Sequence, residues 1–193
     1  MKKIIAIMFG LLILIPVSIK AQSAQEQVLA FNQKTTVNAD STVDIRETIL
    51  YSFPAAKHGI FRYIPNRYLD KSNNKYFETP ISNITVVDEK NNPYVFSTAK
   101  SGNFIELQIG DPNTTISGEH TYIISYKVTG VINYFSDHDE FYWNVTGNEW
   151  EVPVNDVTAE ITLPSTVDKA SIIEKCYTGT TGSKDMNCSY DYT

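Results

Sequence analysis

The chain contains little cysteine: two residues in 193, Cys176 and Cys188, and none before them. Without an early cysteine, the sequence offers no site for a lipid near its N-terminus. Eleven residues rich in turn formers separate the two cysteines, and a disulfide closing such a loop would stabilise the fold by about 2–3 kcal/mol. A metal site is the alternative, although neither cysteine has a neighbouring histidine or a second cysteine pair. We predict a Cys176–Cys188 disulfide.

Basic residues are also scarce. The chain has 16 Lys and Arg against 22 Asp and Glu, which gives a net charge of −6. Residues 1–21 contain lysines and no acidic residue, so the chain without them is more negative still. Nucleic acids and anionic lipids both require a basic surface. We therefore expect no nucleic-acid partner.

Motifs of the common enzyme classes are missing. The sequence has no Gly-x-Ser-x-Gly elbow, no His-Glu-x-x-His and no glycine-rich phosphate loop. We expect no enzymatic activity, no catalytic residue, no metal and no cofactor. A hydrolase with paired carboxylates stays open as an alternative, because the sequence does not show how far apart its acidic residues lie.

A long apolar run occurs once, at residues 4–17. It follows Lys2 and Lys3 and precedes the small residue Ala21, which is the order of a secretory signal. The run is shorter than the roughly 20 residues that span a bilayer, so an uncleaved membrane anchor is the weaker alternative. We predict a signal peptide over residues 1–21 and one extracytoplasmic domain over 22–193. The protein is then exported to the periplasm or the cell surface.

The rest of the chain has the period of β-strands, and no amphipathic helical stretch exceeds two turns. One parity of residues 43–53 holds Val43, Ile45, Glu47, Ile49, Tyr51 and Phe53. Such alternation is typical of a half-buried strand. We predict further strands at 28–37, 81–87, 94–98, 104–109, 120–132, 141–145, 154–163 and 171–177. The pattern indicates an all-β fold, an antiparallel β-sandwich that is immunoglobulin-like in architecture, although the Cys…Trp…Cys spacing of immunoglobulins is absent.

Glu47 interrupts an otherwise apolar strand face. A carboxylate that points at a core is costly unless it is paired. Arg62 is the nearest candidate partner in the sequence, and we predict a buried Glu47–Arg62 ion pair. In the alternative, a bulge turns Glu47 outward or the residue lies at a strand edge.

The segment 53–65 is dense in turn formers and aromatic residues. A loop that exposes His58, Phe61, Arg62 and Tyr63 could bind a partner. In the alternative, the loop folds its aromatic side chains over one end of the sandwich. A second cluster, residues 137–140, combines three carboxylates with His138. It lacks the spacing and the glycine of a calcium loop, and we expect a solvated hairpin there.

Three patches together resemble a family of bacterial membrane proteins, domain of unknown function 2207. They are Val-Asp-Ile-Arg-Glu at 43–47, His-Gly-Ile-Phe-Arg-Tyr-Ile-Pro at 58–65, and the stretch from Phe-Tyr-Trp-Asn at 141–144 to Trp-Glu-Val-Pro at 150–153. The resemblance covers residues 27–190. It implies structural roles for Gly59, Trp143, Asn144, Gly147 and Trp150: the tryptophans anchor the core and the glycines supply turns with positive φ.

Members of that family carry a signal peptide, this extracytoplasmic domain and then membrane spans. This chain stops at Thr193 without a span, so it is either a fragment that lacks its last strand or a short member without an anchor. The resemblance implies no activity. We expect a non-enzymatic interaction or sensor module of a bacterial envelope protein, with a protein or glycan partner. Membrane contact is expected only through a segment outside this chain. A secreted carbohydrate-binding module is the alternative.

Overall fold

The computed structural model describes residues 25–70, 74–180 and 182–191, and the expected signal peptide lies outside them. Within this part, the chain forms β-strands and one short 3₁₀ helix, and no α-helix. The elements are β1 (Gln27–Val37), β2 (Val43–Lys57), β3 (Ile60–Pro65), β4 (Arg67–Asp70), β5 (Lys75–Glu78), β6 (Ile81–Val87), β7 (Phe96–Ser101), β8 (Phe104–Ile109), β9 (Ile116–Val128), β10 (Ile132–Tyr134), β11 (Asp139–Phe141), β12 (Val154–Thr162) and η1 (Lys169–Ser171). The all-β prediction is confirmed.

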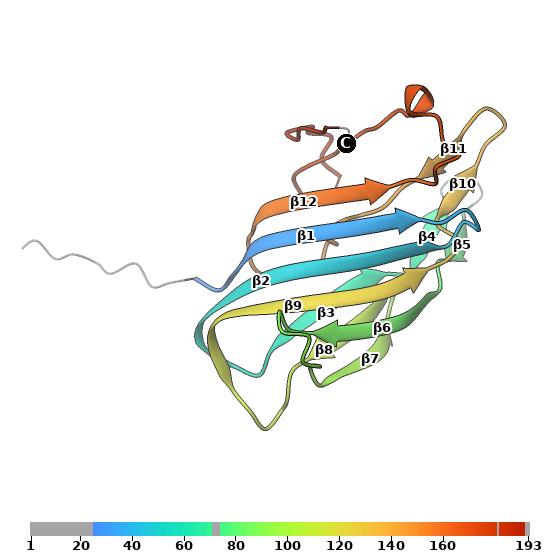
Figure 1. Cartoon of the computed structure of the whole chain (residues 1–193). Helices are drawn as coiled ribbons and strands as arrows, with labels where there is room; N and C mark the ends of the chain where they lie inside the picture. The colour runs from blue at the N-terminus through green and yellow to red at the C-terminus, as the bar shows by residue number, and fades with distance from the viewer. Residues whose placement is uncertain (1–24, 71–73, 181, 192–193) are drawn as a thin grey trace, which may run out of the picture.

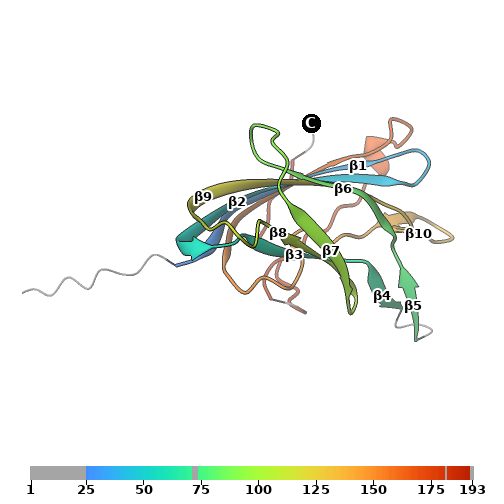
Figure 2. The same ribbon diagram turned by 90° about the horizontal axis from the view of Figure 1, so that it is seen from below.

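Two sheets form the body of the molecule (Figures 1 and 2). The larger sheet has five strands in the order β12-β1-β2-β9-β6, and the smaller has three in the order β3-β8-β7. Figure 2 shows the two layers from below, with the smaller sheet underneath. The pairs β4–β5 and β10–β11 form separate two-stranded sheets at one end. This strand order does not establish an immunoglobulin-like topology.

The hydrophobic core lies between the two layers. Its largest strand contribution comes from β2, in which buried and outward-facing side chains alternate. Side chains of one parity, from Val43 to Phe53, are buried against the smaller sheet, and those of the other parity face outward. The hairpin that joins β1 to β2 turns at residues 38–41, where Ser41 has a positive φ of 65°. Each fully buried aliphatic or aromatic side chain, such as Phe31 or Ile49, stabilises the fold by about 1.5–3 kcal/mol.

The sheet is not wholly antiparallel, which corrects one part of the prediction. β12 pairs with β1 in parallel, with Phe31 opposite Val157 and Thr35 opposite Ile161. A parallel neighbour requires a long crossover connection, and the chain between β1 and β12 includes the whole of the smaller sheet. Alternation along one strand reveals its buried face but not the direction of its neighbour.

Several predicted strands have different bounds in the structure. The strand expected at 120–132 is β9, which ends at Val128 before Gly130 turns the chain with a φ of 72°. The strand expected at 141–145 is wrong, because β11 ends at Phe141 and the following residues form a loop. The strand expected at 171–177 is also wrong: this segment is irregular.

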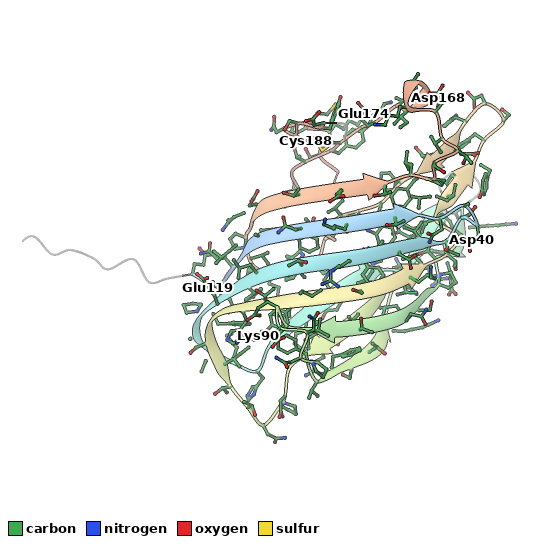
Figure 3. All side chains as sticks on the ribbon, viewed as in Figure 1. Asp40, Lys90, Glu119, Asp168, Glu174 and Cys188 are labelled. Carbon is green, nitrogen blue, oxygen red and sulfur yellow. A yellow bond between two sulfur atoms is a disulfide. The ribbon has the colours of Figure 1, made fainter. Side chains whose placement is uncertain are left out.

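Figure 3 shows Cys188 in the C-terminal segment beyond β12, and this cysteine forms the predicted disulfide with Cys176. No residue after Leu163 belongs to the hydrophobic core within the described part of the chain. We therefore expect the C176S/C188S variant to unfold in urea with a free energy within about 0.5 kcal/mol of the wild type. Limited proteolysis should instead cut faster between residues 176 and 188, since the bridge constrains only that loop. A loss of the roughly 2–3 kcal/mol expected for loop closure would show that the loop unfolds together with the core.

Candidate functional site

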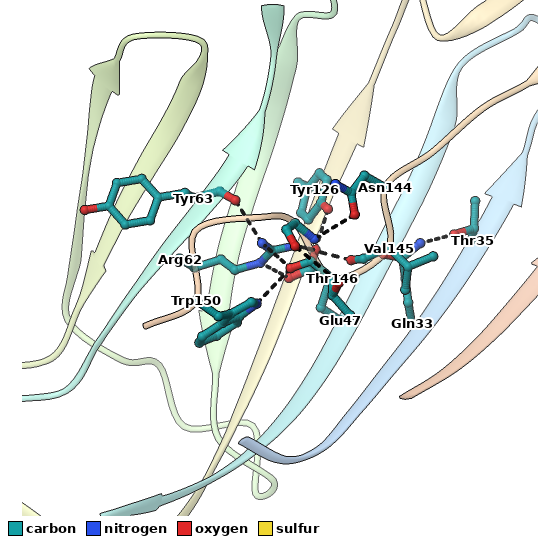
Figure 4. Close-up of polar contacts among 11 residues, drawn as sticks. Gln33, Thr35, Glu47, Arg62, Tyr63, Tyr126, Asn144, Val145, Thr146 and Trp150 are labelled. Atoms are coloured by element: carbon teal, nitrogen blue, oxygen red, sulfur yellow. Dashed lines mark hydrogen bonds and ion pairs between the residues drawn. The ribbon is translucent and has the colours of Figure 1, made fainter. Parts of the chain in front are cut away.

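The Glu47 and Arg62 side chains meet between the two sheets (Figure 4). Glu47 belongs to the inward parity of β2, and Arg62 lies between the inward residues Ile60 and Ile64 of β3. Both are buried, with 0% and 2% of their surface exposed. The guanidinium holds the carboxylate through two bonds, Nε to Oε2 at 2.8 Å and Nη2 to Oε1 at 2.7 Å. The structure thus brings this pair together and does not turn Glu47 outward.

Tyr126 of β9 completes the contacts of the carboxylate. Its hydroxyl donates to Oε1 of Glu47 at 2.6 Å. Burial, together with the nearby Glu47 carboxylate, raises the pKa of Tyr126 well above its ordinary value, so the hydroxyl keeps its proton. Burial opposes the charge of Arg62, but the Glu47 carboxylate and the Tyr126 hydroxyl together outweigh it and raise the pKa of the guanidinium. The result is a charged pair with a neutral phenol as third member.

The remaining donors of Arg62 hold the loop of residues 142–150. Its Nη1 donates to the carbonyl oxygens of Tyr63 at 2.8 Å and Thr146 at 2.9 Å, and its Nη2 donates to that of Val145 at 3.5 Å. Trp150 Nε1 donates to the same Thr146 oxygen at 2.8 Å. Thus the carbonyl groups of Val145 and Thr146, at the end of the segment predicted as a strand, bind side chains from the core in place of a neighbouring strand.

The residues of the family patches shape this loop. Gly147 has a φ of 77°, and its N–H donates to Asn144 Oδ1 at 3.1 Å. Asn144 Nδ2 in turn donates to Asn148 at 2.7 Å. A Cβ at Gly147 would lie 2.5 Å from Arg62 Nη1. The half-buried Trp143 and Trp150 both pack against the core, and Trp150 meets Phe31 edge to face at 6.4 Å.

The predicted interaction loop at 58–63 needs a correction, because most of it is strand β3. Arg62 faces the core and is not available to a partner. His58 Nδ1 lies 3.0 Å from the Thr114 carbonyl oxygen. Phe61 and Tyr63 have the opposite parity and point outward, with 50% of Phe61 exposed. Of the two aromatic residues in the predicted loop, Phe61 is exposed and Tyr63 is half-buried, and both lie on a strand.

These two side chains belong to a larger group of exposed and half-buried aromatic residues. Phe61 stacks on Tyr63 at 6.4 Å, and Tyr63 meets Phe104 of β8 edge to face at 6.3 Å. Phe104 then borders a groove of about 300 Å³ next to β4, lined by Pro65, Arg67, Tyr68, Leu69, Asn103, Phe104, Tyr142, Asn144 and Asn148. We define the aromatic surface as Phe61, Tyr63, Phe104, Tyr68 and Tyr142. Sequence patterns missed Tyr68 and Tyr142, because the strands that follow β3 had no recognised signal and 141–145 resembled a strand.

Burial, with a smaller contribution from Tyr142, raises the pKa of Tyr68 to about 12. The hydroxyl therefore keeps its proton at physiological pH and remains a hydrogen-bond donor. Asn148 and Asn103 add amide groups, which both donate and accept. The lining therefore combines ring faces with uncharged polar groups and the cation of Arg67.

The acidic cluster lies in the β10–β11 hairpin. His138 contacts Asp137 at 2.9 Å, and both are exposed. Within the described residues, no three His, Cys, Asp or Glu side chains gather as they would around a metal ion.

Sequence comparison identifies the domain. A family model described as "predicted membrane protein (DUF2207) N-terminal domain" matches residues 27–191. The chain belongs to this family. The uncharacterized protein YciQ of Escherichia coli K12 is 25% identical over 133 residues, which cover 66% of this chain and 20% of YciQ. The chain thus spans about a fifth of the length of that relative. No helix in the described part of the chain is long and apolar enough to span a bilayer.

Solved structures show a weaker likeness. Two structures of native yeast LTA4 hydrolase, from Saccharomyces cerevisiae, superpose with a TM-score of 0.44 at 11% and 10% identity. Each match covers 72% of this chain and 23% of the hydrolase. A likeness of this size carries no argument about activity.

Proposed function

We propose that this domain is a non-enzymatic interaction or sensor module on the extracytoplasmic side of a bacterial envelope protein. The membership in a family of predicted membrane proteins supports an envelope protein. The Cys176–Cys188 disulfide supports the extracytoplasmic side, because disulfides persist in oxidising compartments. The predicted signal peptide at residues 1–21 supports the same location.

The aromatic surface carries the proposal. Exposed aromatic side chains that gather on one face of a soluble domain are typical of binding sites, and tyrosine is enriched among the residues that dominate binding energy. In this domain the aromatic surface lies on β3, β4, β8 and the 142–150 loop. Phe61 and Tyr142 are exposed, and the other three side chains are half-buried. The buried Glu47–Arg62 pair holds both β3 and the loop, so the surface is presented on a rigid support.

The same arrangement suits a sensor. Tyr142 and Asn148 line the groove, while the carbonyl groups of Val145 and Thr146, between them in the chain, bind Arg62. A ligand that displaced the loop would act directly on the contact between the two sheets. Binding in the groove would therefore change the stability of the whole sandwich.

A carbohydrate-binding module is the second candidate, and the lining of the groove favours it. Tyrosine and phenylalanine rings offer flat apolar faces to a sugar ring, and asparagine amides match its hydroxyl groups. The described lining includes no carboxylate, so we propose no hydrolytic acid pair there.

One experiment tests both candidates. The exported chain is immobilised and exposed either to detergent-solubilised envelope proteins or to a panel of cell-wall polysaccharides, and binding of soluble glycans is followed by tryptophan fluorescence. We expect the F61A/Y142A variant to bind at least about tenfold more weakly, because each aromatic anchor contributes roughly 1–2 kcal/mol. The matched control is Val95→Ala, which changes a residue with 64% of its surface exposed outside the aromatic surface.

The outcome separates the possibilities. Binding of a defined envelope protein supports the interaction module, and binding of a polysaccharide supports the second candidate. Equal binding by the wild type and F61A/Y142A, or no binding to either set of probes, would contradict the role of the aromatic surface.

A further inference from the structure

β12 is an edge strand of the larger sheet and is open to solvent. It pairs with β1 on one side and, within the described residues, with no strand on the other. The described residues that follow it, 163–180 and 182–191, add no strand to this edge (Figure 1). An open edge presents unpaired backbone N–H and C=O groups, and natural sheets usually protect such an edge with charges, proline or a bulge. The nine residues of β12 contain no proline, and their two charged side chains, Asp156 and Glu160, have the parity of the outer face.

One face of β12 is apolar and uncovered. Val157, Ala159 and Ile161 lie opposite the buried residues Phe31, Gln33 and Thr35 of β1, so they belong to the inner face of the larger sheet. Nevertheless, 46% of Val157 and 51% of Ile161 are exposed. The smaller sheet has three strands against five, so it is too narrow to cover this edge.

We propose that β12 pairs antiparallel with β12 of a second copy of this chain, centred on Ala159. A two-fold axis through Ala159 places this residue opposite its own copy. The pairing joins the two five-stranded sheets into one continuous sheet. It uses a surface distinct from the aromatic surface.

This register alone places the aliphatic side chains of the two β12 strands opposite each other and keeps their carboxylates apart. With Ala159 at the centre, Val157 lies opposite Ile161 of the second copy, and Ile161 opposite Val157. Directly opposed aliphatic pairs stabilise a sheet. On the outer face, Glu160 lies opposite Thr158 and Asp156 opposite Thr162, so no two carboxylates face each other.

Neighbouring registers bring carboxylates together or separate the aliphatic pairs. Centring on Thr158 places Asp156 opposite Glu160, and centring on Glu160 places that carboxylate opposite itself; like charges directly opposed destabilise a strand pair. Shifts of two residues keep the charges apart but leave one aliphatic residue without its partner. Lys34 of β1, whose ammonium lies 3.0 Å from Glu160, reduces the remaining negative charge at this edge.

Sedimentation velocity of the exported chain over a concentration series tests the pairing. We expect a reversible monomer–dimer equilibrium, since edge pairing of this extent supports affinities of about micromolar strength. A chain that stays monomeric up to concentrations of roughly 0.5 mM overturns the proposal.

Charged substitutions test the register. V157K and I161E should each weaken the dimer by about tenfold or more, because each leaves a charge opposite an aliphatic side chain. An equimolar mixture of the two variants should dimerise again, because the introduced ammonium then faces the introduced carboxylate. Val95→Lys, a matched change at a more exposed valine, should leave the dimer intact. A dimer that survives both variants, or a mixture that stays monomeric, overturns the register.

A covalent test is independent of those variants. Ala159 faces its own copy, and directly opposed residues of antiparallel strands lie within the Cα separation that a disulfide bridges. A159C should therefore form a covalent dimer when diamide is added as the oxidant. T162C, at the far end of the strand, should not. Equal cross-linking of both variants, or of neither, overturns the proposal.

Discussion

The Arg62→Ala variant is expected to lose about 3–5 kcal/mol of unfolding free energy, the typical cost of breaking a buried ion pair from one side. Removal of the guanidinium leaves the Glu47 carboxylate buried, with Tyr126 as its one remaining side-chain donor among the described residues. It also removes the donors to Val145 and Thr146, and thereby frees the 142–150 loop. Urea denaturation followed by circular dichroism measures the effect.

Two controls separate this ion pair from a general effect of losing an arginine. Arg46 lies on the outward parity of the same strand β2 and is exposed, so Arg46→Ala should change the free energy of unfolding by less than about 0.5 kcal/mol. The double variant E47L/R62M removes both charges and should be more stable than Arg62→Ala, because no unpaired charge remains in the core. If the two single alanine variants unfolded at the same urea concentration, the pair would not hold the sheets together.

The Gly59→Ala variant is expected to destabilise the fold by more than about 4 kcal/mol. Losses of this size are exceptional among point variants and are typical of severe steric conflicts. Gly59 precedes β3 with a φ of 139°, and a Cβ there would lie 1.9 Å from the carbonyl oxygen of Ile109. Gly110 has the reciprocal geometry: its Cβ would lie 1.8 Å from the carbonyl oxygen of His58. Either substitution therefore forces β3 and β8 apart at the start of their pairing.

A third glycine provides the reference for this measurement. Gly102, in the turn between β7 and β8, has a φ of 61° and no atom within 4 Å of a Cβ position. Gly102→Ala should therefore cost only the backbone term of about 1–2 kcal/mol. The yield of exported, folded protein and the urea midpoint compare the variants. If the Gly59→Ala and Gly102→Ala variants were equally stable, the backbone around Gly59 would accommodate a Cβ without loss of the β3–β8 pairing.

Most of the strands could be predicted because their signal is local. The parity of β2 predicted its buried face, including the buried carboxylate at Glu47. The same reasoning could have found Tyr126, which shares the parity of Tyr122 and Ile124 on β9. It failed at 142–145, where Trp143 and Val145 alternate as in a strand but pair with no strand in the described part of the chain. Alternation reports which residues face the core, whereas a strand also requires a backbone neighbour.

The sequence by itself determined the all-β class, the buried face of β2, the cysteine pairing and the family. These depend on the spacing of residues along the chain, which periodicity and turn chemistry translate directly into local structure. Only the tertiary structure decided the parallel pairing of β12, the exposure of Val157 and Ile161, and the anchoring of the 142–150 loop by Arg62. It also assembled the aromatic surface from β3, β4, β8 and the 142–150 loop. These features depend on which segments become neighbours in space, and the packing of the whole core determines those neighbours.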